Sequence, residues 1–190
     1  MRTRFPSAYV MSVMSDDHPG IVAAVGQTID RLGGNIDACS QTVLSGYFTL
    51  IMIVSLPDAI DANRLASDVR GDGAGATGCQ VMARAFQDLG GAERTEPVER
   101  FVITAFGRDK PGVLLRFSQY LAGKDINIID LYGDRRGEDF VLVSQVEIPV
   151  HWNLSMLQAD LEHMGSEQGF TVHLQHENVF VATNELRLTR

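Results

Sequence analysis

The sequence contains little of what several classes of protein require. It has 2 cysteines in 190 residues, Cys39 and Cys79, with no C-x-x-C pair and no histidine near either at metal-ligand spacing. That usage suits a reducing compartment. No apolar run approaches the ~18 residues of a membrane-spanning helix, and residues 1–10 lack the apolar core of a signal peptide. We therefore expect a cytoplasmic protein.

Positive charge is also scarce. The chain carries 16 Lys and Arg against 24 Asp and Glu, a formal net charge of −8, and its isoelectric point is about 5.0. This balance argues against a basic surface for nucleic acid, although it leaves open a role in transcription through another protein. The chain is 45% apolar and 21% charged, which is enough to form a packed core. Its length fits one large domain or two small ones.

An internal repeat favours two small domains. The stretch "DDHPGIV" at residues 16–22 returns as "RDKPGVL" at residues 108–114, a shift of 92 positions. The same shift, applied without a gap to residues 10–57, aligns these identical pairs: Val10/Val102, Asp17/Asp109, Pro19/Pro111, Gly20/Gly112, Gln27/Gln119, Asn35/Asn127, Ile36/Ile128, Phe48/Phe140, Leu50/Leu142, Val54/Val146 and Pro57/Pro149. The agreement extends far beyond the motif, so we infer an internal duplication.

Each half shows the same order of secondary-structure signals. A short β-rich run (residues 8–14 or 100–106) is followed by Asp-x-Pro-Gly, where we expect Asp17 or Asp109 to cap a helix and the proline to occupy its first turn. Helical spacing then places apolar residues on one face: Ile21, Val22, Val25, Ile29 and Leu32 in the first half, and Val113, Leu114, Phe117 and Leu121 in the second. Glycines are expected to end both helices, at Gly33-Gly34 and Gly123.

A hairpin, a second helix and a last strand complete each half. The hairpins are expected at residues 35–56 and 127–148, with turns at Ser45-Gly46 and Gly137-Glu138. The second helix has strong apolar spacing after Asn153, which we interpret as its cap, and weak spacing around Leu65 and Val69 in the first half. The last strands are expected at residues 79–86 and 170–176.

The resulting β-α-β-β-α-β order predicts an α+β fold of two ferredoxin-like domains, each an antiparallel sheet with helices on one face. We place the domains at residues 1–87 and 100–190 and a polar linker at 88–99. In this fold Cys39 and Cys79 lie at opposite edges of one sheet, too far apart for a disulfide bond. Phe48, Leu50 and Val54 are separated by even numbers of residues, so their side chains lie on one face of the strand, and we expect that face to lie under the helices. The other face then carries Ile51 and Ile53, an apolar surface that we expect to be covered within the chain or in a dimer.

These motifs resemble the ACT domain family. Asp-x-Pro-Gly-aliphatic at a strand-to-helix turn, Asn-Ile about fifteen residues later and the tandem βαββαβ pattern carry the resemblance, which covers residues 9–186. Two such domains in a chain of this length are similar to the glycine cleavage system transcriptional repressors. The resemblance implies a non-enzymatic regulatory protein that senses glycine or another small amino acid. It also implies that the protein forms homo-oligomers and contacts a protein partner, such as a transcriptional activator, and not DNA.

The resemblance further implies where the effector binds. ACT domains pair edge to edge, and an amino acid lies where the strand-to-helix turn of one domain meets the Asn-Ile segment of its neighbour. The positions carried over are Asp17, Gly20, Asn35, Ile36, Asp109, Gly112, Asn127 and Ile128. The chemistry is sound by itself, because a helix N-terminus suits an α-carboxylate and a carboxylate or amide can take an α-ammonium. Two other interpretations stay open: these residues serve only as caps and stops, or one half has lost ligand binding.

Other signals carry less weight. The stretch "GAGATG" at residues 73–78 matches G-x-G-x-x-G but follows a helix and precedes a strand, the reverse of a dinucleotide-binding loop. The 5 histidines are scattered, whereas a metal site needs three or four converging ligands. We therefore expect no metal and no cofactor, and no catalytic residues, since two regulatory modules already fill the chain. The alternative function is a regulatory ACT pair related to folate-linked deformylases or amino-acid enzymes, acting on a catalytic partner on another chain.

Overall fold

The computed structural model of the protein describes residues 1–72, 79–88 and 96–181. It divides into two compact units, Met1–Glu93 and Arg94–Arg190, and each is described by itself. Most of the expected linker, residues 88–99, lies outside the described residues, as does the glycine-rich stretch 73–78. The first strand of the second unit begins at Val98, so the last two residues of the expected linker belong to that strand.

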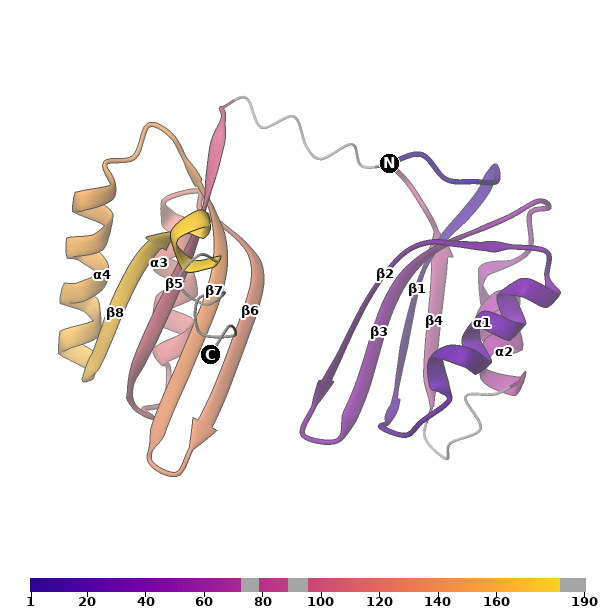
Figure 1. Ribbon diagram of the computed structural model, residues 1–190, viewed down its shortest axis with the longest axis horizontal. Coiled ribbons are helices and arrows are strands. Elements are labelled where there is room, and N and C mark those ends of the chain that lie inside the picture. The colour runs from indigo at the N-terminus through magenta and orange to yellow at the C-terminus, as the bar shows by residue number, and fades with distance from the viewer. Residues whose placement is uncertain (73–78, 89–95, 182–190) are drawn as a thin grey trace. The chain divides into compact units, whose positions relative to one another are not determined.

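The first unit is a four-stranded antiparallel sheet with two helices (Figure 1). Its elements run in the order β1 (Ser7–Asp16), α1 (Ile21–Arg31), β2 (Asn35–Leu44), β3 (Tyr47–Leu56), α2 (Ala62–Asp72) and β4 (Gln80–Ala85). The strands lie in the order β2-β3-β1-β4, with β2 and β4 at the edges.

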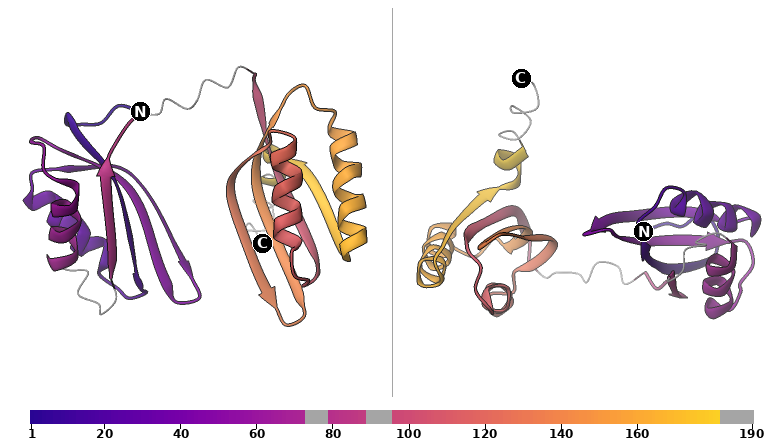
Figure 2. Two further views of the ribbon diagram at one scale, coloured as in Figure 1. Left: turned by 180° about the vertical axis from the view of Figure 1, so that it is seen from behind. Right: turned by 90° about the horizontal axis from the view of Figure 1, so that it is seen from below.

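The second unit repeats this plan. Its elements are β5 (Val98–Arg108), α3 (Val113–Gly123), β6 (Asn127–Arg136), β7 (Asp139–Pro149), α4 (Leu154–Gln168) and β8 (Phe170–His176), and its strand order is β6-β7-β5-β8. Both helices of each unit cover the same face of its sheet (Figure 2). The predicted fold class, two ferredoxin-like α+β units, is confirmed. Within the described part of the chain, no helix has the length and apolar character needed to cross a membrane.

Local backbone features agree with the duplication. Both hairpins turn over two residues, and Ser45 (φ 51°) and Gly46 (φ 86°) are both left-handed, as type I′ hairpin turns require. The edge strands β2 and β6 each shift register once, between Ile36 and Ala38 and between Ile128 and Asp130. Such a bulge at the same place in both units is an inherited feature of the repeat.

The core of each unit lies between its sheet and its helices. Phe48, Leu50 and Val54 are buried there, as predicted from their parity. The helical faces were predicted with one error in each half, because Val22 and Leu114 are exposed by 50% and 43%. Both residues are the second of their helix and point away from the sheet, whereas Ile21, directly before Val22, is 1% exposed.

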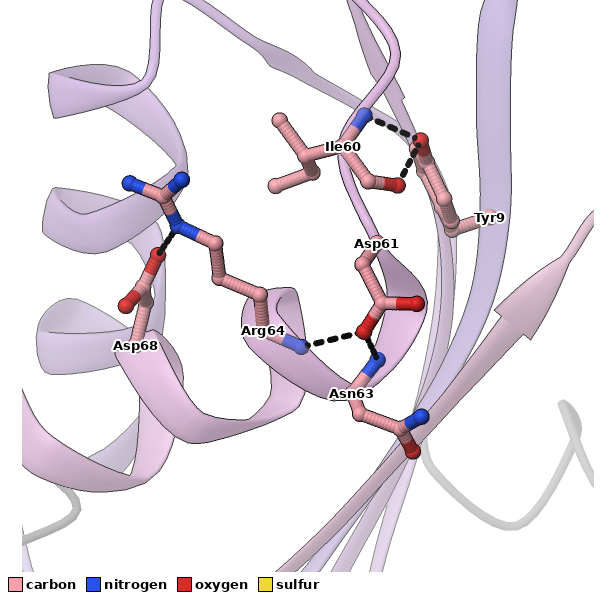
Figure 3. Close-up of polar contacts among 6 residues, drawn as sticks. All are labelled: Tyr9, Ile60, Asp61, Asn63, Arg64 and Asp68. Atoms are coloured by element: carbon pink, nitrogen blue, oxygen red, sulfur yellow. Dashed lines mark hydrogen bonds and ion pairs between the residues drawn. The ribbon is translucent and has the colours of Figure 1, made fainter.

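The start of α2 explains how a helix with weak apolar spacing is held in place (Figure 3). Asp61 accepts hydrogen bonds through Oδ1 from the backbone N–H groups of Asn63, at 2.9 Å, and Arg64, at 3.1 Å. The Tyr9 hydroxyl both donates to the Ile60 carbonyl, at 2.7 Å, and accepts from the Ile60 N–H, at 2.9 Å. In the second unit the predicted cap Asn153 accepts from Met156 N at 3.1 Å at the start of α4.

The outer sheet faces, opposite the helices, differ between the units. In the first unit Ile51 is 54% exposed and Ile53 partly exposed, and no described part of that unit covers them. In the second unit a helical turn over residues 177–181 lies on the equivalent face (Figure 2). The two cysteines are free, with Cys39 on β2 and Cys79 directly before β4, at the opposite edges that the predicted strand order assigned to them.

Candidate functional site

The β1–α1 turn of the first unit ends in a helix start without a side-chain cap. Gly20 is the N-cap residue with φ 102°, a left-handed conformation that favours glycine. Its carbonyl accepts the first helical hydrogen bond, from Ala24 N at 2.9 Å. Among the described residues no side chain accepts from the N–H groups of the first turn. These donors and the positive end of the helix dipole therefore remain open to a ligand.

The turn of the second unit has the same backbone. Gly112 is the N-cap with φ 87°, and within the described part of the chain no side chain caps α3. The expectation that Asp17 and Asp109 cap the helices, with proline in the first turn, is therefore wrong. The left-handed glycine moves the helix start to Ile21 and Val113, so the aspartates lie too early in the chain to reach the first-turn N–H groups.

Asp17 and Asp109 anchor their turns through the backbone instead. The Asp17 N–H donates to the Gly46 carbonyl at 2.8 Å, and the Asp109 N–H donates to the Glu138 carbonyl at 2.8 Å. Each turn thus lies beside the hairpin loop of its own unit. The two carboxylate side chains have no role in this anchoring and are left for other contacts.

The two carboxylates have different surroundings. Asp109 Oδ2 lies 3.2 Å from Arg135 Nε, so the carboxylate of the second unit is paired. The position equivalent to Arg135 in the first unit is Val43, and the exposed Asp17 has no partner for its side chain among the described residues. The first turn therefore presents an unpaired carboxylate next to an uncapped helix start, and the second does not.

His18 adds a polar group to the first turn that its place in the sequence did not predict. Its Nδ1 lies 3.0 Å from the Pro19 carbonyl, and its buried Nε2 has no partner among the described residues. If Nδ1 carries the proton and donates to Pro19, Nε2 is an acceptor. The only sequence signal for this group was its place inside the repeated motif, where the second unit has Lys110.

The Asn-Ile segments lie far from these turns within each unit. Asn35 pairs across the sheet with Ser55, whereas the turn follows Asp16, which pairs with Tyr47 at the other end of β3. Ser55 lies eight residue steps along the extended strand from Tyr47, or roughly 27 Å at about 3.4 Å per step. The register of β6 on β7 repeats the arrangement, with Asn127 opposite Glu147 and Arg136 opposite Asp139. Neither unit alone brings its turn and its Asn-Ile segment together.

The side chains of these segments have local roles. Asn35 Nδ2 donates to Asp37 Oδ1 at 2.8 Å, and Asn127 Nδ2 donates to Glu147 Oε2 at 3.4 Å. Ile36 and Ile128 are partly buried against the cores of their units. Both isoleucines therefore support the fold, while the two asparagines keep amide oxygens directed to no described partner.

Metal binding has no support in this part of the molecule or elsewhere in the described residues. No group of three or more His, Cys, Asp or Glu lies close enough to hold a metal ion within residues 1–72, 79–88 and 96–181. The groups that the first turn presents to a small charged molecule are the backbone N–H groups of α1 and the Asp17 carboxylate.

Comparison with known proteins assigns the fold to a family. The sequence profile of the ACT domain matches residues 8–77 and 99–175, one match in each unit. The chain belongs to the ACT domain family. The sequence is 36% identical over 84 residues to UPF0237 protein MMP0657 of Methanococcus maripaludis, a match that covers 44% of this chain and 93% of the relative. A UPF0237 protein of Methanosarcina acetivorans is 30% identical over 82 residues, covering 43% of this chain and 89% of the relative.

Two solved structures share the tandem arrangement along most of the chain. A protein of unknown function from Galdieria sulphuraria aligns with a TM-score of 0.70 and 23% identity, covering 90% of this chain and 98% of its own. A "putative glycine cleavage system transcriptional repressor" aligns with a TM-score of 0.56 and 16% identity over the same shares of the two chains. At these identities the likeness concerns the fold. The fold of two ferredoxin-like units is thus found in other chains.

Proposed function

We propose that this ACT protein is a non-enzymatic cytoplasmic regulator that senses a small amino acid, glycine or similar, and acts through contacts with another protein. The observation that carries the proposal is the first-unit turn, where the unpaired Asp17 carboxylate lies beside an uncapped helix start. Membership of a family of regulatory modules supports the regulatory role. The two unbonded cysteines are consistent with a reducing compartment.

The two charged groups of an amino acid have matching partners at this turn. The α-carboxylate would accept from the first-turn N–H groups of α1, where the helix dipole favours negative charge. The α-ammonium would donate to the exposed Asp17 carboxylate. A Cβ built on Gly20 meets nothing within 4 Å, so the space above the turn is open. The second unit fits less well, because Arg135 already pairs with Asp109.

The Asn35 segment would complete the site from a neighbouring copy of the chain, and the sheet edges favour such a neighbour. At the edge strand β4, Arg70 Nη2 donates to the Val81 carbonyl at 3.1 Å. At the edge strand β8, Gln158 accepts from Leu174 N at 2.8 Å. Strand β6 carries charged residues, whereas residues 38–46 of the first unit are exposed and carry no charge. Edge strands without such protection are suited to pair with another strand.

Antiparallel pairing of two β2 strands would bring the two parts of the site together. The beginning of one β2, with Asn35, would lie opposite the end of the other, with Leu44. That end lies beside the β1–α1 turn, because Asp17 N donates to Gly46 O at 2.8 Å. We therefore propose a homodimer in which the turn of one copy and Asn35 of the other enclose the amino acid.

A thermal-shift screen of the twenty amino acids tests the proposal. A ligand at 100 times its dissociation constant stabilises the folded protein by about 2.7 kcal/mol, a readily measured shift. Glycine or another small amino acid should raise the melting temperature, and Asn35→Ala should reduce the effect more than its counterpart Asn127→Ala. If no amino acid at millimolar concentration shifts the melting temperature, the sensing role is wrong.

A further inference from the structure

The outer face of the first sheet contains an apolar groove. It is lined by Val10 of β1, by Ala38 and Ser40 of β2, and by Ile51 and Ile53 of β3. The groove has a volume of about 350 Å³, and Ile51 is 54% exposed in it. We call this surface the first groove. An exposed apolar surface of this kind commonly marks a site of interaction.

The second unit has the same groove at equivalent positions, and there it is covered. Val102, Asp130, Tyr132, Val143 and Gln145 lie 92 positions after the residues of the first groove, and all of them line one cavity. The helical turn over residues 177–181 closes this second groove with the side chains of three residues, Glu177, Phe180 and Val181.

The contacts show how the second groove holds its helical turn. Phe180 and Val181 line the cavity together with the sheet face, where Val102 is only 5% exposed, while Val181 itself is 45% exposed. Gln145 Nε2 donates a hydrogen bond to the Glu177 carboxylate at the rim. The spacing of the three residues, at i, i+3 and i+4, is that of one face of a helix. This chain thus already uses the groove to hold an amphipathic helical segment.

The first groove differs in ways that define its occupant. Ile53 occupies the position of Gln145, so the first groove lacks the side-chain amide that donates a hydrogen bond to Glu177 in the second groove. The smaller residues Ala38 and Ser40 replace Asp130 and Tyr132, which leaves more room above the sheet. The first groove is therefore suited to a helix with larger and wholly apolar contacts.

We propose that the first groove docks an amphipathic helix of a partner protein that presents aliphatic or aromatic side chains at i, i+3 and i+4. The inference rests on the part of the proposed function that has this regulator act through protein contacts. The helical turn of a second copy is a poor occupant, because its Glu177 would face Ile53 and become buried without a hydrogen-bond donor, which is costly. That segment is also already engaged in its own groove.

A peptide based on the chain's own helical turn provides the probe. It covers residues 175–181 with a helix-stabilising staple and carries the change Glu177→Leu, which matches its apolar face to Ile53. The fluorescence anisotropy of the labelled peptide is measured as the full chain is added. We expect saturable binding. The peptide that retains Glu177 should bind at least tenfold more weakly.

Protein variants locate the binding site of the peptide. Ile51→Glu should weaken binding at least tenfold, whereas Met82→Glu should leave it unchanged. Met82 is a matched control, because it lies on the same sheet face, is 71% exposed and does not line the first groove. If Ile51→Glu lowers the melting temperature, Ile51→Ser carries the test with a smaller change at the same position.

Several results would overturn the proposal. They are the absence of saturable binding, equal affinity of the two peptides, or an equal loss in the Met82 variant. Sedimentation that shows a dimer dissociated by Ile51→Glu would assign the groove to a second copy instead. Amino-acid binding is measured on the same wild-type protein. A wild type that binds an amino acid but not the peptide contradicts the docking site alone, and one that binds the peptide but no amino acid contradicts the sensing role alone.

Discussion

At the scale of single residues, the structure separates positions that look equivalent in the repeat. Asp17 and Asp109 occupy the same place in the motif, yet only Asp109 has an ion-pair partner within the described residues, at 3.2 Å from Arg135. His18 and Lys110 differ in the same segment. The two turns share a backbone and differ in the chemistry that they offer to a ligand.

The cap of α2 gives a prediction at this scale. Asp61→Ala should lower the free energy of unfolding by about 0.5–2 kcal/mol, because it removes the acceptor for two first-turn N–H groups. Asp17→Ala should cost almost nothing, since Asp17 caps no helix. Chemical denaturation of both variants measures the difference. Equal losses in the two variants would contradict the assignment of the caps.

The pH dependence of stability should report on Asp37. Burial acts to raise its pKa, but hydrogen bonds from the Ser55 side chain, the Arg4 backbone and the Asn35 side chain outweigh burial and hold the pKa below its ordinary value of 3.8. A group with a lowered folded-state pKa stabilises the fold at pH above the unfolded-state value. This contribution should be fully present above pH 3.8 and lost as the pH falls through the lower folded-state pKa.

Thermal melts of the wild type and Asp37→Asn at several pH values test this expectation. The wild type should lose more of its melting temperature than the variant as the pH falls below 3.8. Parallel losses in the two proteins would show that Asp37 makes no such contribution.

At the scale of secondary-structure elements, the sheet edges show how each unit controls strand pairing. The Gln158 side chain accepts from Leu174 N at 2.8 Å and donates to the Val172 carbonyl at 3.3 Å, so it pairs with β8 as another strand would. Arg70 protects the edge strand β4 in a similar way, by donating a hydrogen bond to the Val81 carbonyl. The uncharged segment 38–46 of the first unit has no such protection.

Gln158→Ala should expose the outer edge of β8. We expect a loss of about 0.5–1.5 kcal/mol for each lost hydrogen bond, partly offset by water at this surface position. The amide of Leu174 should exchange its hydrogen faster in the variant, while that of Val172 should not change, because its carbonyl and not its N–H contacts Gln158. An unchanged exchange rate at Leu174 would contradict the role of Gln158.

The sequence predicted the positions of the strands more accurately than the residues at which α1 and α3 begin. Alternating apolar residues and two-residue turns define strands, so β2, β3 and β6 were predicted to the residue. The left-handed φ of Gly20 and Gly112 is a backbone property that the letters Asp-x-Pro-Gly do not reveal, so both helix starts were wrong. The difference between the two turns also escaped prediction. It depends on the residue type at one position, Arg135 in β6 and Val43 in β2, which pair with Phe140 and Phe48 in the same register. The sequence alone does not show that this position lies beside the aspartate.

At the scale of the whole molecule, the two units share one fold but differ in the properties of their surfaces. The first has an uncharged edge at residues 38–46, an open apolar groove and an unpaired carboxylate at its turn. The second has a charged edge strand β6, a covered groove and a paired carboxylate. The proposed ligand site and the proposed docking groove therefore both lie on the first unit.

Cysteine cross-linking tests the proposed pairing of β2 strands. Cys39 lies near the middle of β2 (Asn35–Leu44), so antiparallel pairing about that point would bring the Cys39 thiols of two copies close together. A short bismaleimide should then link two wild-type chains and two Cys79→Ser chains, but not two Cys39→Ser chains. Cross-linking that persists in Cys39→Ser would contradict this pairing.

The central claim is that the first-unit turn binds a small amino acid through Asp17. Calorimetry with glycine and other small amino acids on the wild type, Asp17→Ala and Asp109→Ala tests it most directly. Asp17→Ala should lower the affinity by about 10- to 150-fold, the equivalent of ~1.5–3 kcal/mol for a hydrogen bond to a charged group, without lowering stability. Asp109→Ala should leave the affinity unchanged, because its carboxylate is paired with Arg135. An affinity that is intact in Asp17→Ala, or lost only in Asp109→Ala, would contradict the claim.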